Sequence, residues 1–358
     1  MSIVSTGNKI ISNGLTSEIG VVGNVRKLAN KLNKIAIHET KGDALTYTFP
    51  KATAEDLKRL TSKSIKDSYK RVTWTNPEDN KVYHILEEGR KGGKVQVRIL
   101  DKDGEFLKNA ELEPKTIMIL DEFVSIRGVA HGKLMETLAK RFNPFANVER
   151  MNHKRGLIEY LKYKRDLPLS LEVKRYEELA KKMDKGKKVD YISVSEAYMV
   201  DINEVLGKNG QTQRDYVAKS GTIRVLGPVV KKIMEKGTRI LESAGNNFRY
   251  ANRSVSDELA IEGIEGVGAL RNGKIAQDSC SRNSVFTQHY ERRDFPATLT
   301  KDENGKVLGL NISGLVGTDL PLNWKTKHLI GANLGGTSYS TPIRVAKLAL
   351  NDMMQGIV

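Results

Sequence analysis

The pattern of apolar and polar positions changes character near residue 115. Before this point, apolar positions recur at helical spacing in two segments and alternate with polar positions in three more. The predicted helices are residues 24–36 and 53–68, and the predicted strands are 71–75, 81–86 and 94–100. A turn rich in Asn, Pro and Asp at 76–80 separates the first two strands. Residues 1–115 are therefore predicted to form a small N-terminal α+β domain.

Beyond residue 115 the strands become short and almost wholly apolar. The run 116–120 ends at Asp121, and such an unbroken run is typical of a strand buried on both faces of a parallel sheet. Further strands are predicted at 191–194, 239–241 and 266–270, and helices at 133–141, 171–183, 228–236 and 343–353. The alternation predicts a doubly wound α/β domain with a mostly parallel sheet over residues 116–358. Active sites in such domains lie at the carboxyl ends of strands.

Composition adds little to this picture beyond excluding some classes of protein. The chain has 358 residues, 39% hydrophobic and 28% charged, which is ordinary for a globular protein. Its one cysteine, Cys280, rules out an intrachain disulfide framework. We find no apolar run long enough to span a bilayer and no signal-peptide pattern in the first 20 residues. The expectation is a cytoplasmic protein with no membrane partner, with signal-independent export left open.

The formal net charge of +16 raises the question of an anionic partner such as nucleic acid. Both parts of the chain carry the excess, and in its densest stretch, 150–188, basic residues are interleaved with acidic ones. Such interleaving is typical of solvated helix faces, so nucleic-acid binding is the less favoured interpretation.

The strongest chemical signal is the segment GTSYSTP at 336–342. Its small residues would let Ser338 lie at the exposed start of a helix, and Pro342 suits a first turn. The amino terminus of a helix directs N–H groups and partial positive charge at a reacting carbonyl. The plain alternative is a helix cap rich in Ser and Thr.

A reactive serine needs a base, and the base needs an orienting acid. Asp121 ends the first apolar strand, and the pair His131-Gly132 opens the next predicted helix. The segment SAGN at 243–246 follows the strand at 239–241. Taken alone, each is weak, because an Asp at a strand end and a Gly-Asn pair are both common in turns.

In this order, the four segments resemble the motifs of the subtilisin-like serine peptidases, over about residues 115–358. The resemblance implies a triad of Asp121, His131 and Ser338, with the side chain of Asn246 as an oxyanion donor; the neighbouring Asn247 fits the spacing less well. It also implies a substrate-binding strand and turn at Ser193, Ser195, Glu196, Ser243, Ala244 and Gly245. A carboxylate at Glu196 suggests a preference for a basic substrate side chain, and an exposed strand-end Glu is the alternative.

The sequence also departs from the family pattern. Asp121 is followed by Glu122-Phe123 where the family has Ser or Thr and then Gly, and Lys133-Leu134 replaces the usual Thr-His after His-Gly. Ten residues separate Asp121 from His131, where many members have a longer insert. A divergent branch of the family explains these differences, and an inactive homologue is the alternative.

The predicted function is hydrolysis of a protein or peptide substrate through an acyl-enzyme, by a serine endopeptidase that requires no cofactor. Two alternatives stay open, an inactive subtilisin-like binding protein and a basic nucleic-acid-binding protein. No histidine pair has zinc-site spacing, so no metal ligands are predicted. No calcium signature is present either, and calcium dependence is left open. Residues 1–115 resemble no known family and are either a propeptide ending near 113–115 or a recruiting domain. The sequence leaves the oligomeric state open.

Overall fold

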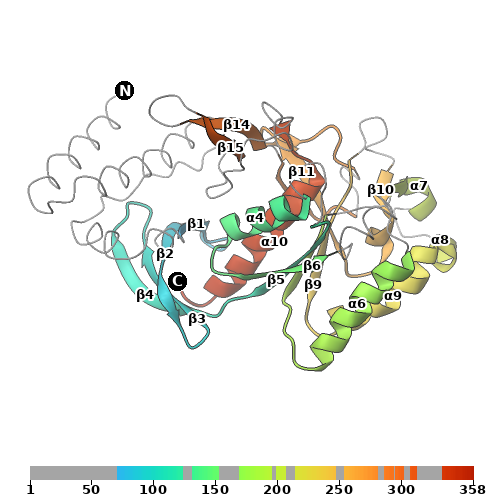
Figure 1. The fold of residues 1–358 in the computed structure, drawn as a ribbon, viewed down its shortest axis with the longest axis horizontal. Coiled ribbons are helices and arrows are strands. Elements are labelled where there is room, and N and C mark those ends of the chain that lie inside the picture. Colours follow the sequence, from blue (N-terminus) through green and yellow to red (C-terminus); the bar gives the residue numbers. More distant parts are fainter. Residues whose placement is uncertain are drawn as a thin grey trace, which may run out of the picture. The chain divides into compact units, whose positions relative to one another are not determined.

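The computed structural model describes the chain in segments that include most of the predicted elements (Figure 1). These segments are residues 71–123, 131–152, 169–195, 199–206, 214–246, 254–280, 286–293, 295–301, 307–312 and 333–358. The chain divides into two compact units, residues 1–89 with 96–110, and residues 90–95 with 111–358. The helices predicted at 24–36 and 53–68 lie outside the described residues. The predicted division into domains at 115/116 stays a prediction.

The first unit is built around a four-stranded sheet in the order β1-β2-β3-β4. Its strands are β1 (Arg71–Thr75), β2 (Val82–Lys91), β3 (Lys94–Leu100) and β4 (Phe106–Leu112). The turn predicted between the first two strands is present, with Asn80 at a φ of 59° and the Asn76 side chain accepting from the Glu78 N–H. The three predicted strands are confirmed. Strand β4 was missed because most of its side chains are exposed, so it has no alternating apolar pattern.

The second unit contains a seven-stranded sheet in the order β12-β11-β9-β7-β5-β6, with β13 paired to β11. Pairing is parallel from β6 through β5, β7, β9 and β11 to β13, and antiparallel only between β11 and β12. The strands are β5 (Thr116–Asp121), β6 (Asn147–Asn152), β7 (Tyr191–Val194), β9 (Arg239–Ser243), β11 (Glu265–Arg271), β12 (Lys274–Ile275) and β13 (His289–Arg292). The chain is therefore of the α/β class, as predicted.

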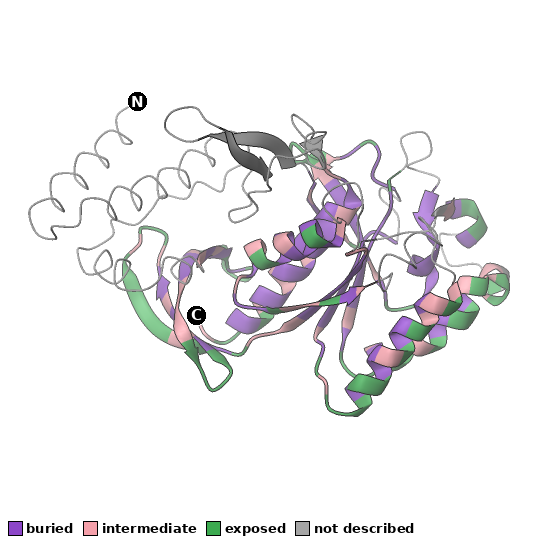
Figure 2. Ribbon diagram, in the orientation of Figure 1, coloured by how far each residue is buried: buried purple, intermediate pink, exposed green. Residues whose placement is uncertain are grey.

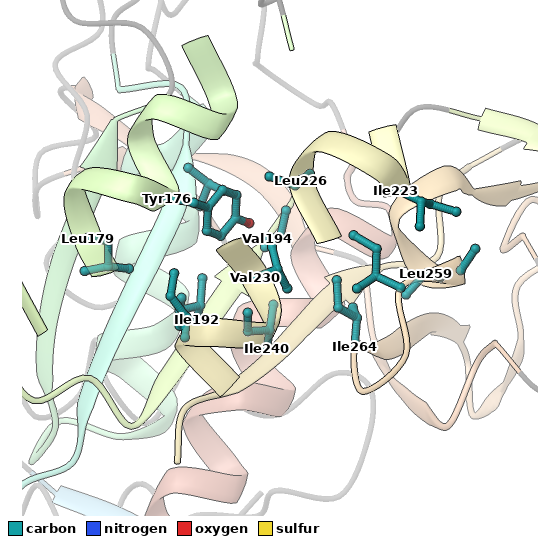
Figure 3. Close-up of a cluster of buried hydrophobic side chains, with 14 of the residues drawn as sticks. Tyr176, Leu179, Ile192, Val194, Ile223, Leu226, Val230, Ile240, Leu259 and Ile264 are labelled. Carbon is teal, nitrogen blue, oxygen red and sulfur yellow. The ribbon is translucent and has the colours of Figure 1, made fainter. Parts of the chain in front are cut away.

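Helices pack against both faces of this sheet, in two separate hydrophobic clusters. One cluster lies between the sheet and helices α6 (Leu169–Asp184) and α9 (Gly221–Met234), and Figure 3 shows its buried side chains. The other lies under α4 (His131–Phe142) and α10 (Thr337–Met354). Ile192 of β7 belongs to the first cluster and its neighbour Tyr191 to the second, as alternation along a strand requires.

Burial follows these layers, since β7 and most of β5 are buried and the outer faces of the helices are exposed (Figure 2). Strands buried on both faces explain the unbroken apolar runs in the sequence. Within the part of the chain that the structure describes, no helix is both long and apolar enough to cross a membrane.

Shorter elements complete the described fold. They form a two-stranded antiparallel sheet of β8 (Met199–Asp201) and β10 (Ser254–Ser256), and a three-stranded sheet of β14 (Phe295–Lys301), β15 (Val307–Ile312) and β16 (Asn333–Leu334). Three short helices accompany these strands in the chain. Between β8 and β10 are α7 (Ile202–Val205) and α8 (Arg214–Lys219), and the 3-10 helix η2 (Asp257–Ala260) follows β10 directly.

Two helix starts differ from the sequence prediction, both because of a proline. Helix α9 begins at Gly221 and not at Pro228, where the sequence predicted its start. The Ser220 side chain caps the helix by accepting from the Ile223 N–H. Helix α10 begins at Thr337, which places Pro342 in its second turn and not its first. In both cases the prediction put the proline in the first turn, where it is best tolerated, although in the folded protein it lies further inside the helix.

Candidate active site

Asp121 is the last residue of β5, and its side chain is fully buried. One carboxylate oxygen accepts from the Glu122 N–H at 2.6 Å. Both oxygens also lie close to Nδ1 of His131, at 2.9 and 2.8 Å. A carboxylate only accepts hydrogen bonds, so Nδ1 donates here and the proton-accepting lone pair falls on Nε2.

His131 is the first residue of α4, and the glycine after it allows this helix to start against the end of β5. A Cβ at Gly132 would lie 3.0 Å from the Asp121 Cβ, the Glu122 carbonyl oxygen and the Phe123 ring. The Gly132 N–H donates to the Glu122 carbonyl at 2.9 Å. Glycine is therefore required at 132 by close backbone approach, and this approach brings His131 within reach of Asp121.

Ser338 is the second residue of α10 and is half-buried. Its Oγ lies 3.1 Å from Nε2 of His131, which closes a chain of hydrogen bonds from Asp121 through His131 to Ser338. The small residue Ser340 anchors this end of the helix, because its hydroxyl reaches the backbone carbonyls of Glu291 and Arg292 in β13 at 2.8 and 3.1 Å.

Asn246 follows β9 and is tied to the residue before the serine. Its Oδ1 accepts from the Thr337 N–H at 3.0 Å, and the Gly245 N–H donates to the Thr337 hydroxyl at 3.1 Å. Gly336 has a φ of 144°, and a Cβ there would lie 3.0 Å from Nδ2 of Asn246. With its oxygen engaged, Asn246 offers the amino group Nδ2 as a donor beside the start of α10.

The other predicted substrate residues lie at the ends of two adjacent strands. Ser193 is in β7 and Ser195 follows that strand, and Ser243 ends the neighbouring β9 and is followed by Ala244 and Gly245. All five are buried, with Ser193 and Ala244 fully so. Glu196 lies outside the described residues. Contact of these residues with a substrate stays a prediction.

Ser195 makes a contact that the sequence did not indicate. Its hydroxyl donates to the backbone carbonyl of Ser338 at 3.2 Å. In a regular helix, this carbonyl would accept from the N–H four residues later, which is residue 342. Pro342 has no N–H, so the carbonyl is left for Ser195. Only the position of Pro342 four residues after Ser338 could have signalled this contact.

A second group missed by the sequence analysis is a set of buried carboxyls behind β9. Glu242, Glu258 and Glu172 are each at most 2% exposed. Burial is the main cause that raises the pKa of both Glu242 and Glu258, and the nearby acidic groups add to it. The hydroxyl of Ser256 donates to Glu242. Leu241 belongs to the cluster under α4 and α10, and successive side chains of a strand point to opposite faces of the sheet. Glu242 therefore lies on the α6/α9 side of the sheet, away from Ser338.

Among the described residues, no group of three or more His, Cys, Asp or Glu side chains is arranged to hold a metal ion. The expectation that the protein needs no cofactor stays a prediction.

Comparisons with known proteins find only distant similarity. No protein-family model and no curated protein matches it. Among solved structures, it is similar to the prenylagaramide maturation protease PagA, with 14% identity and a TM-score of 0.37 over 66% of this chain and 76% of that one.

Two further structures are also distantly similar. The epidermin leader peptide processing serine protease EpiP from Staphylococcus aureus has 13% identity and a TM-score of 0.37, over 66% of this chain and 64% of its own. A Pseudomonas sedolisin, a serine-carboxyl proteinase, has 12% identity and a TM-score of 0.32, over 67% and 76%. These similarities are weak, so the function proposed below rests on the geometry of the described residues.

Proposed function

We propose that this protein is a subtilisin-like serine endopeptidase with a doubly wound α/β catalytic domain. One observation carries the proposal, the continuous chain of hydrogen bonds from Asp121 through His131 to Ser338. The acid and base are 10 residues apart in the chain, and the base and serine are 207 apart. A nucleophile, a base and an orienting acid in this order and contact are what acyl transfer requires.

In the first half of the proposed reaction, Ser338 Oγ attacks the carbonyl carbon of a peptide bond as Nε2 of His131 takes the serine proton. The carbonyl becomes an oxyanion, which Nδ2 of Asn246 and the backbone N–H of Ser338 stabilise by donating hydrogen bonds. Asp121 holds the imidazole in one tautomer and stabilises the imidazolium. His131 then gives its proton to the leaving amine, and an ester on Ser338 remains.

In the second half, His131 takes a proton from water, and the resulting hydroxide attacks the ester carbonyl. The carboxylic acid product leaves as Ser338 regains its proton from His131. Every proton that His131 accepts is thus returned, and the enzyme ends in its starting state without a redox or organic cofactor.

The proposed substrate is a protein or peptide bound in extended form near the carboxyl ends of β7 and β9. Ser193, Ser195 and Glu196 on one side, and Ser243 to Gly245 on the other, are the proposed walls. An extended peptide can pair with backbone groups as an added strand, which would place its scissile bond between Asn246 and Ser338.

Residues 1–115 have two proposed roles, a propeptide cut near 113–115 or a permanent recruiting domain. Mass spectrometry of the purified protein during incubation distinguishes them. Loss of the first 115 residues in the wild type, but not in Ser338→Ala, supports a propeptide that the enzyme removes itself. A fully active chain of unchanged mass supports the recruiting domain.

The function is tested by labelling the purified protein with a fluorophosphonate probe, which reacts with activated serines. The wild type is expected to be labelled, and Ser338→Ala and His131→Ala are not. Ser256→Ala is a control that changes a buried serine outside the proposed site. Cleavage of a peptide library would then define specificity, including the preference for basic residues linked to Glu196.

Equal labelling of Ser338→Ala and the wild type would contradict the proposal. No labelling of the full-length wild type would call for removal of the N-terminal unit by limited proteolysis. If labelling then appears, the first unit blocks the site; if it does not, the protein is an inactive member of this fold.

A further inference from the structure

An aromatic residue next to Ser338 contacts the proposed base. Tyr339 follows Ser338 in α10 and is 6% exposed. Its ring centroid lies 5.7 Å from that of His131, with the two ring planes at 85°. Edge-to-face pairs at this separation are attractive because the positive edge of one ring meets the negative face of the other.

This contact matters because the rotation of the His131 ring about its Cβ–Cγ bond sets both of its hydrogen bonds. Asp121 holds Nδ1 and Ser338 meets Nε2. Rotation about that bond swings both nitrogens out of line with their partners, so a surface against the ring that opposes the rotation supports both hydrogen bonds at once. The His131 side chain is also 37% exposed, so protein atoms do not enclose it on every side.

We propose that Tyr339 is a positioning residue, which fixes the rotation of the His131 ring and so keeps its Nε2 lone pair directed at Ser338. The inference rests on the function proposed above and adds a residue to its machinery. Tyr339 is not a catalytic residue, because it acts through His131 and exchanges no proton.

Tyr339 is itself held firmly enough for this role. It belongs to the hydrophobic cluster under α4 and α10, together with Ile117, Leu134 and Met135. Burial, with the Asp121 charge in addition, raises the pKa of the Tyr339 hydroxyl far above its ordinary value. The phenol therefore stays neutral from pH 5 to 9, and its own ionisation does not alter the ring contact.

The position of Tyr339 in the chain also couples two functions. Because it follows Ser338 directly in a helix, the nucleophile and the surface that orients its base move as one rigid body. A shift of α10 would therefore carry both groups together and preserve their positions relative to each other.

The test is the rate at which Ser338 reacts with the fluorophosphonate probe, measured from pH 5 to 9 in the full-length chain. Tyr339→Phe keeps the ring and should react as the wild type does. Tyr339→Leu removes it and should react roughly 2- to 10-fold more slowly, the fold-change that corresponds to the usual strength of such a pair. The midpoint of its pH profile should also move, because that midpoint reports the base in the free enzyme.

Phe142→Leu is the matched control for lost packing. Phe142 packs against the same cluster from the other end of α4 and is not in ring contact with His131. It should lower stability without moving the pH midpoint. A Tyr339→Leu protein with the rate and midpoint of the wild type would overturn the inference.

A spectroscopic readout keeps the inference testable if the wild type is unreactive. In protein labelled with carbon-13 at histidine Cε1, the His131 signal is identified by its loss in His131→Gln. A ring-current shift of this signal should persist in Tyr339→Phe and disappear in Tyr339→Leu. A wild type that shows this pattern and stays unreactive after removal of the N-terminal unit would contradict the proposed peptidase and keep the ring contact. An unchanged His131 signal in Tyr339→Leu would contradict the contact itself.

Discussion

The hydroxyl of Ser195 donates a hydrogen bond to the backbone carbonyl of Ser338, at 3.2 Å. The contact joins the residue after β7 to the first turn of α10. The Ser338 carbonyl is available for it because Pro342, four residues later, has no N–H to donate. Ser195 was predicted to bind substrate, and in the structure its side chain holds the residue proposed as nucleophile. This one bond links the central sheet to the reactive end of the helix.

Replacing Ser195 by alanine should slow labelling of Ser338. The buried carbonyl would lose its partner, at a cost of about 1 kcal/mol, which corresponds to roughly a fivefold change if it is felt at the serine. Ser256→Ala is the matched control, because it removes a buried hydroxyl that donates to Glu242 on the α6/α9 side of the sheet, away from Ser338. Labelling kinetics and denaturant unfolding of both variants check this, and equal labelling rates in the two would contradict it.

Asn246 should matter more for reaction than for folding. Asn246→Ala removes the Nδ2 donor and also the acceptor of the Thr337 N–H, and loss of that helix-start hydrogen bond costs about 1 kcal/mol of stability. Loss of one oxyanion donor lowers turnover roughly 100- to 1,000-fold in serine peptidases. Steady-state cleavage of a peptide found in the library screen measures this, with KM expected to change much less than kcat. A variant that keeps full kcat would remove Asn246 from the proposed mechanism.

Gly132 should tolerate no side chain. In Gly132→Ala the new Cβ meets Asp121, Glu122 and Phe123 at 3.0 Å, and such overpacking costs about 1–3 kcal/mol. The displaced helix start would also separate His131 from Asp121 and abolish labelling. The control is Gly221→Ala at the start of α9, where nothing lies within 4 Å of the new Cβ and a gain of about 0.4–1 kcal/mol is expected. Thermal unfolding of the two variants should therefore shift in opposite directions.

The buried carboxyls behind β9 predict that stability falls as pH rises. The pKa values of Glu242 and Glu258 are raised above 4.5 in the folded protein, chiefly by burial. A raised folded pKa gives stability that is complete below the unfolded pKa and is lost as pH climbs through the folded value. The free energy of unfolding should therefore decline from acidic toward alkaline pH.

Glu258→Gln tests the source of this pH dependence. The amide cannot ionise, so the decline in unfolding free energy with rising pH should become shallower than in the wild type. Urea unfolding across pH 5 to 9 gives the slopes. Glu262→Gln, at a neighbouring carboxyl whose side chain is 89% exposed, should leave the slope unchanged. Identical slopes in wild type and Glu258→Gln would show that other groups control the dependence.

The local sequence was enough to predict the α/β class and the elements on which the site stands. Strands β5 and β7 are buried on both faces, which explains the mostly apolar segments that predicted them, and helix α4 shows the apolar spacing that predicted it. The exposed strand β4 and the start of α9 were not predictable in this way. Strand β4 is mostly exposed and so has no alternating apolar pattern, and tertiary packing keeps Pro228 inside α9 although a proline usually marks a helix start.

The sequence by itself determined which chemical groups this protein has and in what order, because motifs such as GTSYSTP and SAGN are local. Distances between residues far apart in the chain were decided only by the tertiary structure. Parallel strands β5, β7 and β9 bring their carboxyl ends to one edge of the sheet, and α10 crosses beside them with Ser338. The same packing sets the Ser195 hydroxyl on the Ser338 carbonyl and the Tyr339 ring on His131, since neither contact has a signature within a single segment of sequence.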